Sequence, residues 1–164
     1  MQPPAQLATK ESPRQIIFED FRIDLPITGG WGYDFDSACI IDKSDPAVLN
    51  GIPFDGISIE YIFVEKRIYE EMIIFREPHD KYGGIRWNLE IQALLSNEGK
   101  KYDKLIFNIE GFPEEIWNEI TSRFAIIQKS GKFELIAELD AYRESKICRF
   151  KKEYFFDITS FCGQ

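Results

Sequence analysis

The segment ITGGWGYDFDSAC, residues 27–39, is the part of the 164-residue chain richest in side chains that can do chemistry. Asp34 and Asp36 are separated by one residue, so in an extended chain they lie on the same side, about 7 Å apart. Such a pair can hold Mg²⁺ or act as acid and base when a further carboxylate, such as Glu60, joins it. The spacing therefore allows a carboxylate-dependent, magnesium-assisted hydrolase. The alternative interpretation is that both carboxylates are solvated and flank a turn.

Two aromatic side chains, Trp31 and Tyr33, lie among the glycines of the same segment. Aromatic residues are common anchors of protein interfaces, and neighbouring acids speed the encounter with a basic partner. The binding hypothesis assigns the partner-facing side chains to Trp31, Tyr33, Asp34, Asp36, Asp42 and Asp45. The alternative is that Trp31 folds back onto the core beside Cys39 and Ile41. Glycine fits both interpretations, because it permits unusual backbone angles and close approach.

Residue types and spacing exclude several familiar sites. The chain has one histidine, His79, so a multi-histidine metal site is impossible and a catalytic triad would have to use that residue. Cys39, Cys148 and Cys162 form no C-x-x-C pair, which argues against zinc and disulfides. The glycines of residues 27–39 lack the third glycine of the dinucleotide fingerprint, and no G-K-[ST] loop is present. We therefore predict no catalytic residue, no metal and no cofactor.

The charge of the chain is negative and unevenly distributed. The formal net charge is −8, from 28 acidic and 20 basic side chains, and residues 1–60 contain ten acids and four bases. An acidic half repels nucleic acid and anionic lipid and attracts basic proteins. The start of the chain does not read as a secretory signal, and no apolar run approaches the roughly 20 residues of a membrane span. We therefore expect a cytoplasmic protein with a basic protein partner, and neither nucleic-acid nor membrane binding.

The spacing of apolar residues indicates the elements of the first half. Residues 1–15 are polar, contain proline and show no apolar period, which predicts a flexible N-terminal tail. Apolar residues alternate over 16–25, which predicts a half-buried strand that stops at proline. Residues 37–42 are predicted to form a second short strand. Residues 57–77 lack helix breakers and repeat apolar side chains by threes and fours, which favours a helix, although their first part also alternates like a strand.

A hairpin and a helix are indicated in the second half. Apolar residues alternate over 85–95 and again over 102–109, with a turn between, which predicts a hairpin buried on one side. Residues 113–131 begin with proline and two glutamates and end with glycine, which predicts a helix. Trp87 of the hairpin and Trp117 of the helix are both predicted to be largely buried.

Two more strands are predicted, over residues 133–139 and 153–161, with the basic connector 143–152 between them. These elements predict a single α+β domain over residues 16–164, with a mainly antiparallel sheet packed by one or two helices. The connector alternates with aromatic side chains, a pattern that single-stranded nucleic-acid binders use. Because the chain as a whole is acidic, we expect the connector instead to meet the acidic half of its own molecule or of a second copy, which would form a homodimer.

A small acidic α+β domain without a catalytic constellation is similar, in these bulk properties, to bacterial inhibitor and immunity proteins. The resemblance implies a protein-binding module that occludes a basic partner, such as a toxin domain, through its acidic N-terminal half. The alternatives are the carboxylate-dependent hydrolase and a structural or assembly subunit without catalysis.

Overall fold

Strand pairing organises the chain into one curved sheet in the computed structural model, which describes residues 4–49 and 53–163. The strands follow the order β1-β2-β5-β4-β3. Their bounds are Ile27–Gly29 (β1), Cys39–Ile41 (β2), Tyr82–Asn97 (β3), Lys100–Pro113 (β4) and Cys148–Asp157 (β5). Neighbouring strands are antiparallel except β2 and β5, which are parallel. The predicted α+β fold with a mainly antiparallel sheet is therefore confirmed.

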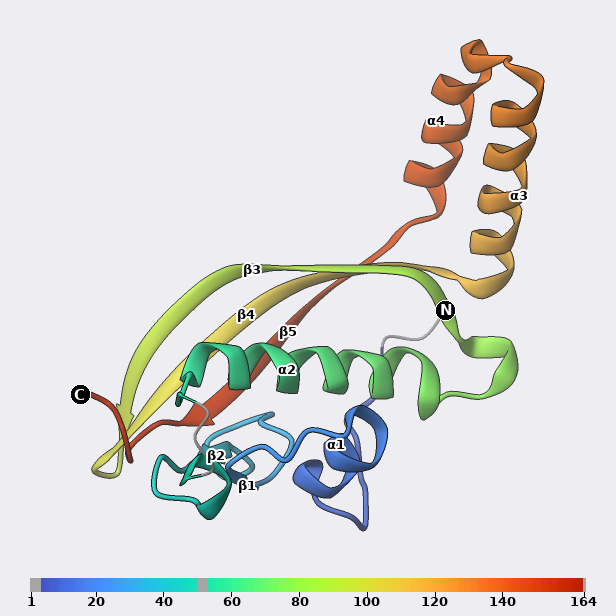
Figure 1. Cartoon of the computed structure of the whole chain (residues 1–164). Coiled ribbons are helices and arrows are strands. Elements are labelled where there is room, and N and C mark those ends of the chain that lie inside the picture. Colours follow the sequence, from blue (N-terminus) through green and yellow to red (C-terminus); the bar gives the residue numbers. More distant parts are fainter. Residues whose placement is uncertain (1–3, 50–52, 164) are drawn as a thin grey trace.

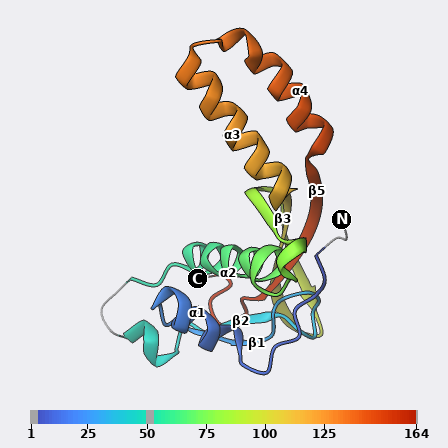
Figure 2. The ribbon, with the colours of Figure 1, turned by 90° about the vertical axis from the view of Figure 1, so that its right-hand side faces the viewer.

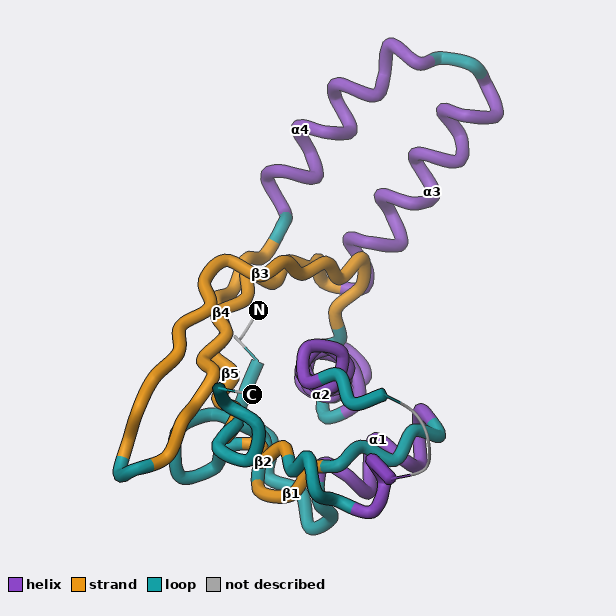
Figure 3. Tube along the Cα trace, turned by 60° about the vertical axis from the view of Figure 1, so that its left-hand side comes forward, coloured by secondary structure: helices purple, strands orange, loops and turns teal. Residues whose placement is uncertain are grey.

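The described residues also form four α-helices: α1 (Pro13–Phe21), α2 (Gly56–Tyr69), α3 (Glu114–Ser130) and α4 (Ile136–Lys146). α2 lies in the hollow of the curved sheet, with β3, β4 and β5 on one side and β1 and β2 on the other (Figures 1 and 3). The main core surrounds this helix. α3 and α4 project together away from the rest of the molecule (Figure 2). Residues 114–146, which contain both helices, are called the arm below.

Capping and burial explain why α2 forms where it does. The Asp55 carboxylate accepts hydrogen bonds from the N–H groups of Ile57 and Ser58, which satisfies two free donors of the first turn. The buried apolar side chains of the helix are Ile59, Phe63, Val64 and Ile68. A π-helical turn, Glu70–Ile74, extends it, so the helix predicted over residues 57–77 is confirmed over most of its length.

β3 and β4 form the predicted hairpin, but a bulge changes which side chains are buried. The turn residues Glu98 and Gly99 have φ angles of 50° and 80°, as a two-residue type I′ turn requires. The pairing shifts between Leu89 and Ile91. The apolar side chains before the shift, Ile85, Trp87 and Leu89, pack against the main core. Leu95, which follows the shift, packs against a separate cluster on the opposite face of the sheet. The unbroken alternation predicted for this strand is therefore wrong beyond the bulge.

Two segments that were predicted to be strands are helical. Residues 16–25 fall mostly in α1, whose start is fixed by Ser12: its hydroxyl accepts the N–H of Gln15, and Pro13 occupies the first helical position. Residues 133–139 form a 3₁₀ turn and the beginning of α4. Their apolar side chains fit a helical period as well as a strand period, and packing against α3 decides between the two.

The remaining predicted elements are confirmed. β2 lies within residues 37–42. α3 ends at Gly131, which has a φ of 71° and donates its N–H to the Ile127 carbonyl over 3.0 Å. β5 contains the first part of the predicted strand 153–161 but starts five residues earlier, so the predicted connector 143–152 is divided between α4 and β5.

The arm has a small core of its own and one aromatic contact that fixes its base. The buried residues of this core are Phe112, Ile120, Ile127 and Leu139. Trp117 stacks on Phe112 with the ring centroids 5.6 Å apart. Its indole also covers the backbone of Gly84, where an added Cβ atom would lie 2.5 Å from the ring. Trp117 is partly buried, as is Trp87, although both were predicted to be largely buried.

We expect Trp117→Ala to destabilise the protein by about 3 kcal/mol, the lower end of the range for large aromatic truncations, because the side chain is only partly buried. Urea unfolding followed by circular dichroism measures the change. Phe124→Ala on the same helix is the matched control, since Phe124 is exposed and its loss should change the free energy of unfolding by well under 1 kcal/mol. Equal effects of the two substitutions would contradict an anchoring role for the stack.

Candidate functional site

The structure divides the six predicted partner-facing residues between the two ends of the β1–β2 hairpin. Trp31, Tyr33, Asp34 and Asp36 lie in the turn that joins the two strands. Asp42 and Asp45 lie beyond the other end, where the N–H of Asp42 donates to the Pro26 carbonyl over 2.9 Å. The six residues therefore do not form one continuous edge.

Trp31 lies inside the molecule. It is 5 % exposed, belongs to the main core together with Cys39 and Ile41, and approaches Phe63 with the ring centroids 5.7 Å apart. Its indole N–H donates to the Thr9 hydroxyl over 3.0 Å. In this structure Trp31 thus offers no exposed ring to a partner. Its position agrees with the alternative interpretation, in which Trp31 folds back onto the core beside Cys39 and Ile41.

Tyr33 connects the N-terminal segment to the centre of the molecule. Its hydroxyl accepts the N–H of Leu7 over 2.8 Å and donates to Glu71 over 3.1 Å. Burial raises the pKa of Tyr33 to about 12. Residues 4–12 form no helix or strand, but they contact the body at these points, and the boundary predicted after residue 15 lies inside α1. Residues 1–3 of the predicted flexible tail lie outside the described residues.

The four aspartates differ in their surroundings. Asp34 accepts the Ser37 N–H over 2.7 Å, and its hydrogen bonds with Ser37 lower the pKa of its carboxyl. Asp36 is exposed. Asp42 accepts the N–H of Ser44 over 2.9 Å. Asp45 binds the Arg14 guanidinium through both oxygens, at 2.8 and 3.1 Å, which lowers the pKa of its carboxyl.

A buried arginine on α2 was not anticipated from the sequence. Arg67 is 1 % exposed and lies between the rings of Tyr33 and Tyr154, with its guanidinium carbon 3.9 and 4.0 Å from their centroids. Its Nε donates to Glu71 over 2.6 Å. Nη1 donates to the backbone carbonyls of Trp31, Gly32 and Glu153 over 3.2, 3.3 and 2.9 Å. One side chain therefore connects α2, the glycine-rich turn and β5.

A second buried pair follows the same four-residue spacing. Lys66 donates to Glu70 over 2.5 Å and also binds Asp20 of α1. The sequence signal for both pairs is the run KRIYEE, residues 66–71, in which two bases precede two acids by four residues. On an exposed helix such pairs are common, so the run by itself does not indicate burial.

Two carboxyl groups meet in the main core. Glu60 is 4 % exposed and shares a hydrogen bond with Asp103 of β4. Asp103 also accepts the side-chain amide of Gln92 over 2.6 Å. Burial and the neighbouring Asp103 raise the pKa of Glu60 to about 9. Within the described part of the chain, Oε2 of Glu60 has no hydrogen-bond partner.

The three carboxylates of the hydrolase alternative are not brought together. Asp34 lies at the exposed turn, whereas Glu60 faces Asp103 inside the core. Among residues 4–49 and 53–163, no three histidine, cysteine, aspartate or glutamate side chains are arranged to hold a metal ion.

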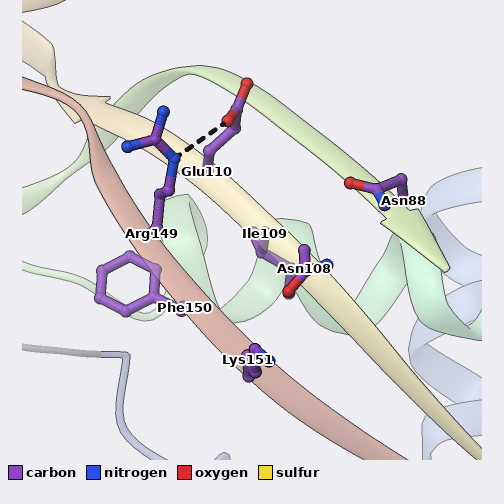
Figure 4. A pocket seen from close by; sticks show the side chains of 7 residues that line it. All are labelled: Asn88, Asn108, Ile109, Glu110, Arg149, Phe150 and Lys151. Atoms are coloured by element: carbon purple, nitrogen blue, oxygen red, sulfur yellow. Dashed lines mark ion pairs between the residues drawn. The ribbon is translucent and has the colours of Figure 1, made fainter. Parts of the chain in front are cut away.

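A hollow of about 440 Å³ lies over β3, β4 and β5 (Figure 4). Asn88, Asn108 and Lys151 lie directly opposite one another on the three strands. Because Ile109 points into the main core, the neighbouring Asn108 and its row point away from α2. The face that carries this row is called the outer face.

A second row lies two residues further along the same strands: Arg86, Glu110 and Arg149. Arg149 pairs with Glu110 over 3.8 Å, as Figure 4 shows, and with Glu144 of the arm over 3.0 Å. Lys151 pairs with Glu90 over 3.1 Å. These bases of the predicted connector thus meet acids of β3, β4 and the arm rather than the acidic N-terminal half.

Large apolar side chains are exposed near the free end of the arm. Four large side chains within residues 124–135 are exposed, with Ile126 at 66 %. They are Phe124, Ile126, Phe133 and Leu135, and are called the arm tip below. Lys129, Lys132 and Glu134 lie among them in the sequence, and Arg123 directly precedes Phe124. The arm tip is the largest group of exposed apolar side chains that comes from one short segment of the described chain.

None of the helices in the described part of the chain combines the length and apolar character that a membrane span requires. A comparison with protein-family models, curated proteins and solved structures found no match for this chain.

Proposed function

We propose that this protein is a protein-binding module of the inhibitor type, which occludes a basic partner domain such as a toxin domain. The arm is the observation that carries the proposal. It projects from the body and adds little to the main core, yet its free end presents the four apolar side chains of the arm tip (Figures 1 and 2).

Single exposed apolar residues are normal on protein surfaces, but a group of them on a projecting element is typical of a binding site. A few buried apolar anchors supply most of the free energy at a protein interface. A narrow helical pair with exposed apolar side chains at its end is suited to entering a cleft in a partner, which supports inhibition by occlusion.

The net charge of the chain supports a basic partner. The chain carries a net charge of −8, and the exposed turn with Asp34 and Asp36 adds to the negative surface of the body. A field of this sign speeds the encounter with a basic protein before close contacts form.

The partner is first isolated by pull-down from the source cell. We expect the triple substitution Asp34→Asn, Asp36→Asn, Asp42→Asn to slow association with it by roughly tenfold at low salt and to leave dissociation nearly unchanged. Asparagine retains a side-chain oxygen that can accept the hydrogen bonds of Asp34 and Asp42 in their turns. Asp45 is left unchanged because it forms an ion pair with Arg14. Surface-immobilised kinetics at two salt concentrations measure both rates. The control neutralises two bases of the outer face, Arg149 and Lys151, to glutamine. Slower association of that control, with the acidic variant unchanged, would assign docking to the outer face and contradict the proposal.

The arm tip is tested by Ile126→Ser with Phe133→Ser, two exposed positions whose change should leave the fold intact by circular dichroism. If the arm enters the partner, this variant should dissociate at least tenfold faster than the unchanged protein, because apolar anchors act mainly on dissociation. Unchanged dissociation would exclude the arm tip as the anchor.

A further inference from the structure

β3 lies at the edge of the sheet and is its longest strand. Among the residues that the structure describes, the strand order places β4 on one side of Tyr82–Asn97 and no strand on the other. An edge strand presents unpaired N–H and C=O groups, to which another strand can add. Proteins usually protect such edges with charges, prolines, bulges or a covering element.

The first half of β3 has these protections. Register shifts interrupt it between Gly83 and Arg86 and between Leu89 and Ile91, and Arg86 and Glu90 place charges along it. Trp117 of the arm covers its beginning. A second chain could not pair regularly with this part.

The second half has none of them. Residues 91–97, IQALLSN, contain no charged residue and no proline, and they pair with β4 without a register shift as far as the turn. Ile91 and Leu94, on opposite faces of the strand, are 49 % and 64 % exposed. A regular, uncharged edge with apolar side chains on both faces is suited to strand addition.

We propose that residues 91–95 pair antiparallel with the same residues of a second copy of this chain, on a two-fold axis that passes through Ala93. The two sheets then continue across the axis with their outer faces on the same side. The contact is isologous, so it closes as a dimer and does not extend into a fibre.

The sequence of the edge favours this occupant and this register. With Ala93 opposite Ala93, Ile91 faces Leu95 and Gln92 faces Leu94, so apolar contacts form and no like charges meet. Moving the axis by one residue to Leu94 would place Glu90 opposite Glu98 of the second copy. The antiparallel arrangement also carries the two arms to opposite ends of the dimer, because the arm lies near the beginning of β3.

The register permits a charge-complementation experiment with two variants, Ala93→Lys and Ala93→Glu. Sedimentation velocity at micromolar concentrations should show a dimer for the unchanged protein and a monomer for each variant, since like charges then meet at the axis. An equimolar mixture of the two variants should form dimers again, because lysine then faces glutamate. Asn88→Lys, on the protected half of the same strand, is the matched control and should remain dimeric.

Three results would overturn the proposal. The first is that the unchanged protein sediments as a monomer, even if the edge of β3 binds an unrelated peptide. Either single variant could remain dimeric while folded by circular dichroism. The mixture could remain monomeric, which would exclude the axis at Ala93. The Ile126→Ser, Phe133→Ser variant, which tests the arm tip, should dimerise normally. The test of the arm as a binding element and the test of the dimer are therefore independent of each other.

Discussion

Arg67→Met should lower the free energy of unfolding by about 3–5 kcal/mol, the cost of removing one partner of a buried ion pair. The substitution leaves the Glu71 carboxylate buried without its guanidinium and removes the hydrogen bonds that Nη1 donates to three backbone carbonyls, of which that of Gly32 still accepts the N–H of Phe155. It also removes the cation between Tyr33 and Tyr154. Urea unfolding monitored by tryptophan fluorescence and circular dichroism measures the loss.

Two further variants separate the contributions at this position. Arg67→Lys keeps the charge but cannot reproduce the planar stacking or the several N–H donors of the guanidinium. The free energy of unfolding of this variant should therefore still be clearly lower than that of the unchanged protein. Arg149→Met removes an exposed arginine that is also paired with glutamate, and should change stability by less than about 1 kcal/mol. If Arg67→Met and Arg149→Met had similar effects, the buried network would not stabilise the fold.

Glu60→Gln should make the protein more stable than the unchanged chain at alkaline pH and leave the two nearly equal near pH 5. The folded state holds the Glu60 proton up to a pH of about 9, whereas the unfolded chain releases it near 4.5. Between these values the folded state binds more protons, so stability falls as pH rises, by up to about 1.4 kcal/mol per pH unit. Glutamine is neutral at every pH and can donate to Asp103 as the protonated acid does. The stability of the variant should therefore not fall with rising pH for this reason.

Urea unfolding at several pH values between 5 and 9 gives the difference between the two proteins directly. Glu90→Gln, an exposed glutamate paired with Lys151, is the control and should follow the unchanged protein at every pH. Parallel profiles for Glu60→Gln and the unchanged protein would show that Glu60 is already ionised in the folded state.

Local signals explain which parts of this fold could be predicted from the sequence. The β3–β4 hairpin and α3 carry their own turn and capping residues, Glu98–Gly99 and Gly131, so neighbouring residues determine them. α1 also has a local signal, Ser12 followed by Pro13, but the apolar alternation that follows points to a strand. In residues 133–139 the strand and helix periods coincide, and contact with α3 decides.

The surroundings of the candidate site depend on contacts between distant parts of the chain. Arg67 on a helix is normally solvated, and its burial depends on Tyr33 and on Tyr154, 87 residues further along the chain. Trp31 shows the same limitation, because its residue type suits an interface and a core equally, and the fold places it in the core. The outer-face row through Asn88 is defined only by strand register, which apolar spacing does not supply.

The arm enters the fold between two strands that are already neighbours. β4 ends at Pro113 and β5 begins at Cys148, and Gly111 lies opposite Cys148 in the sheet. In topological terms the arm is an enlarged hairpin loop, and the entropy of closing a loop grows only slowly with its length. Beyond its base, where Trp117 packs on Phe112 and Gly84, the sequence and length of the arm can therefore diverge during evolution without disturbing the sheet or α2.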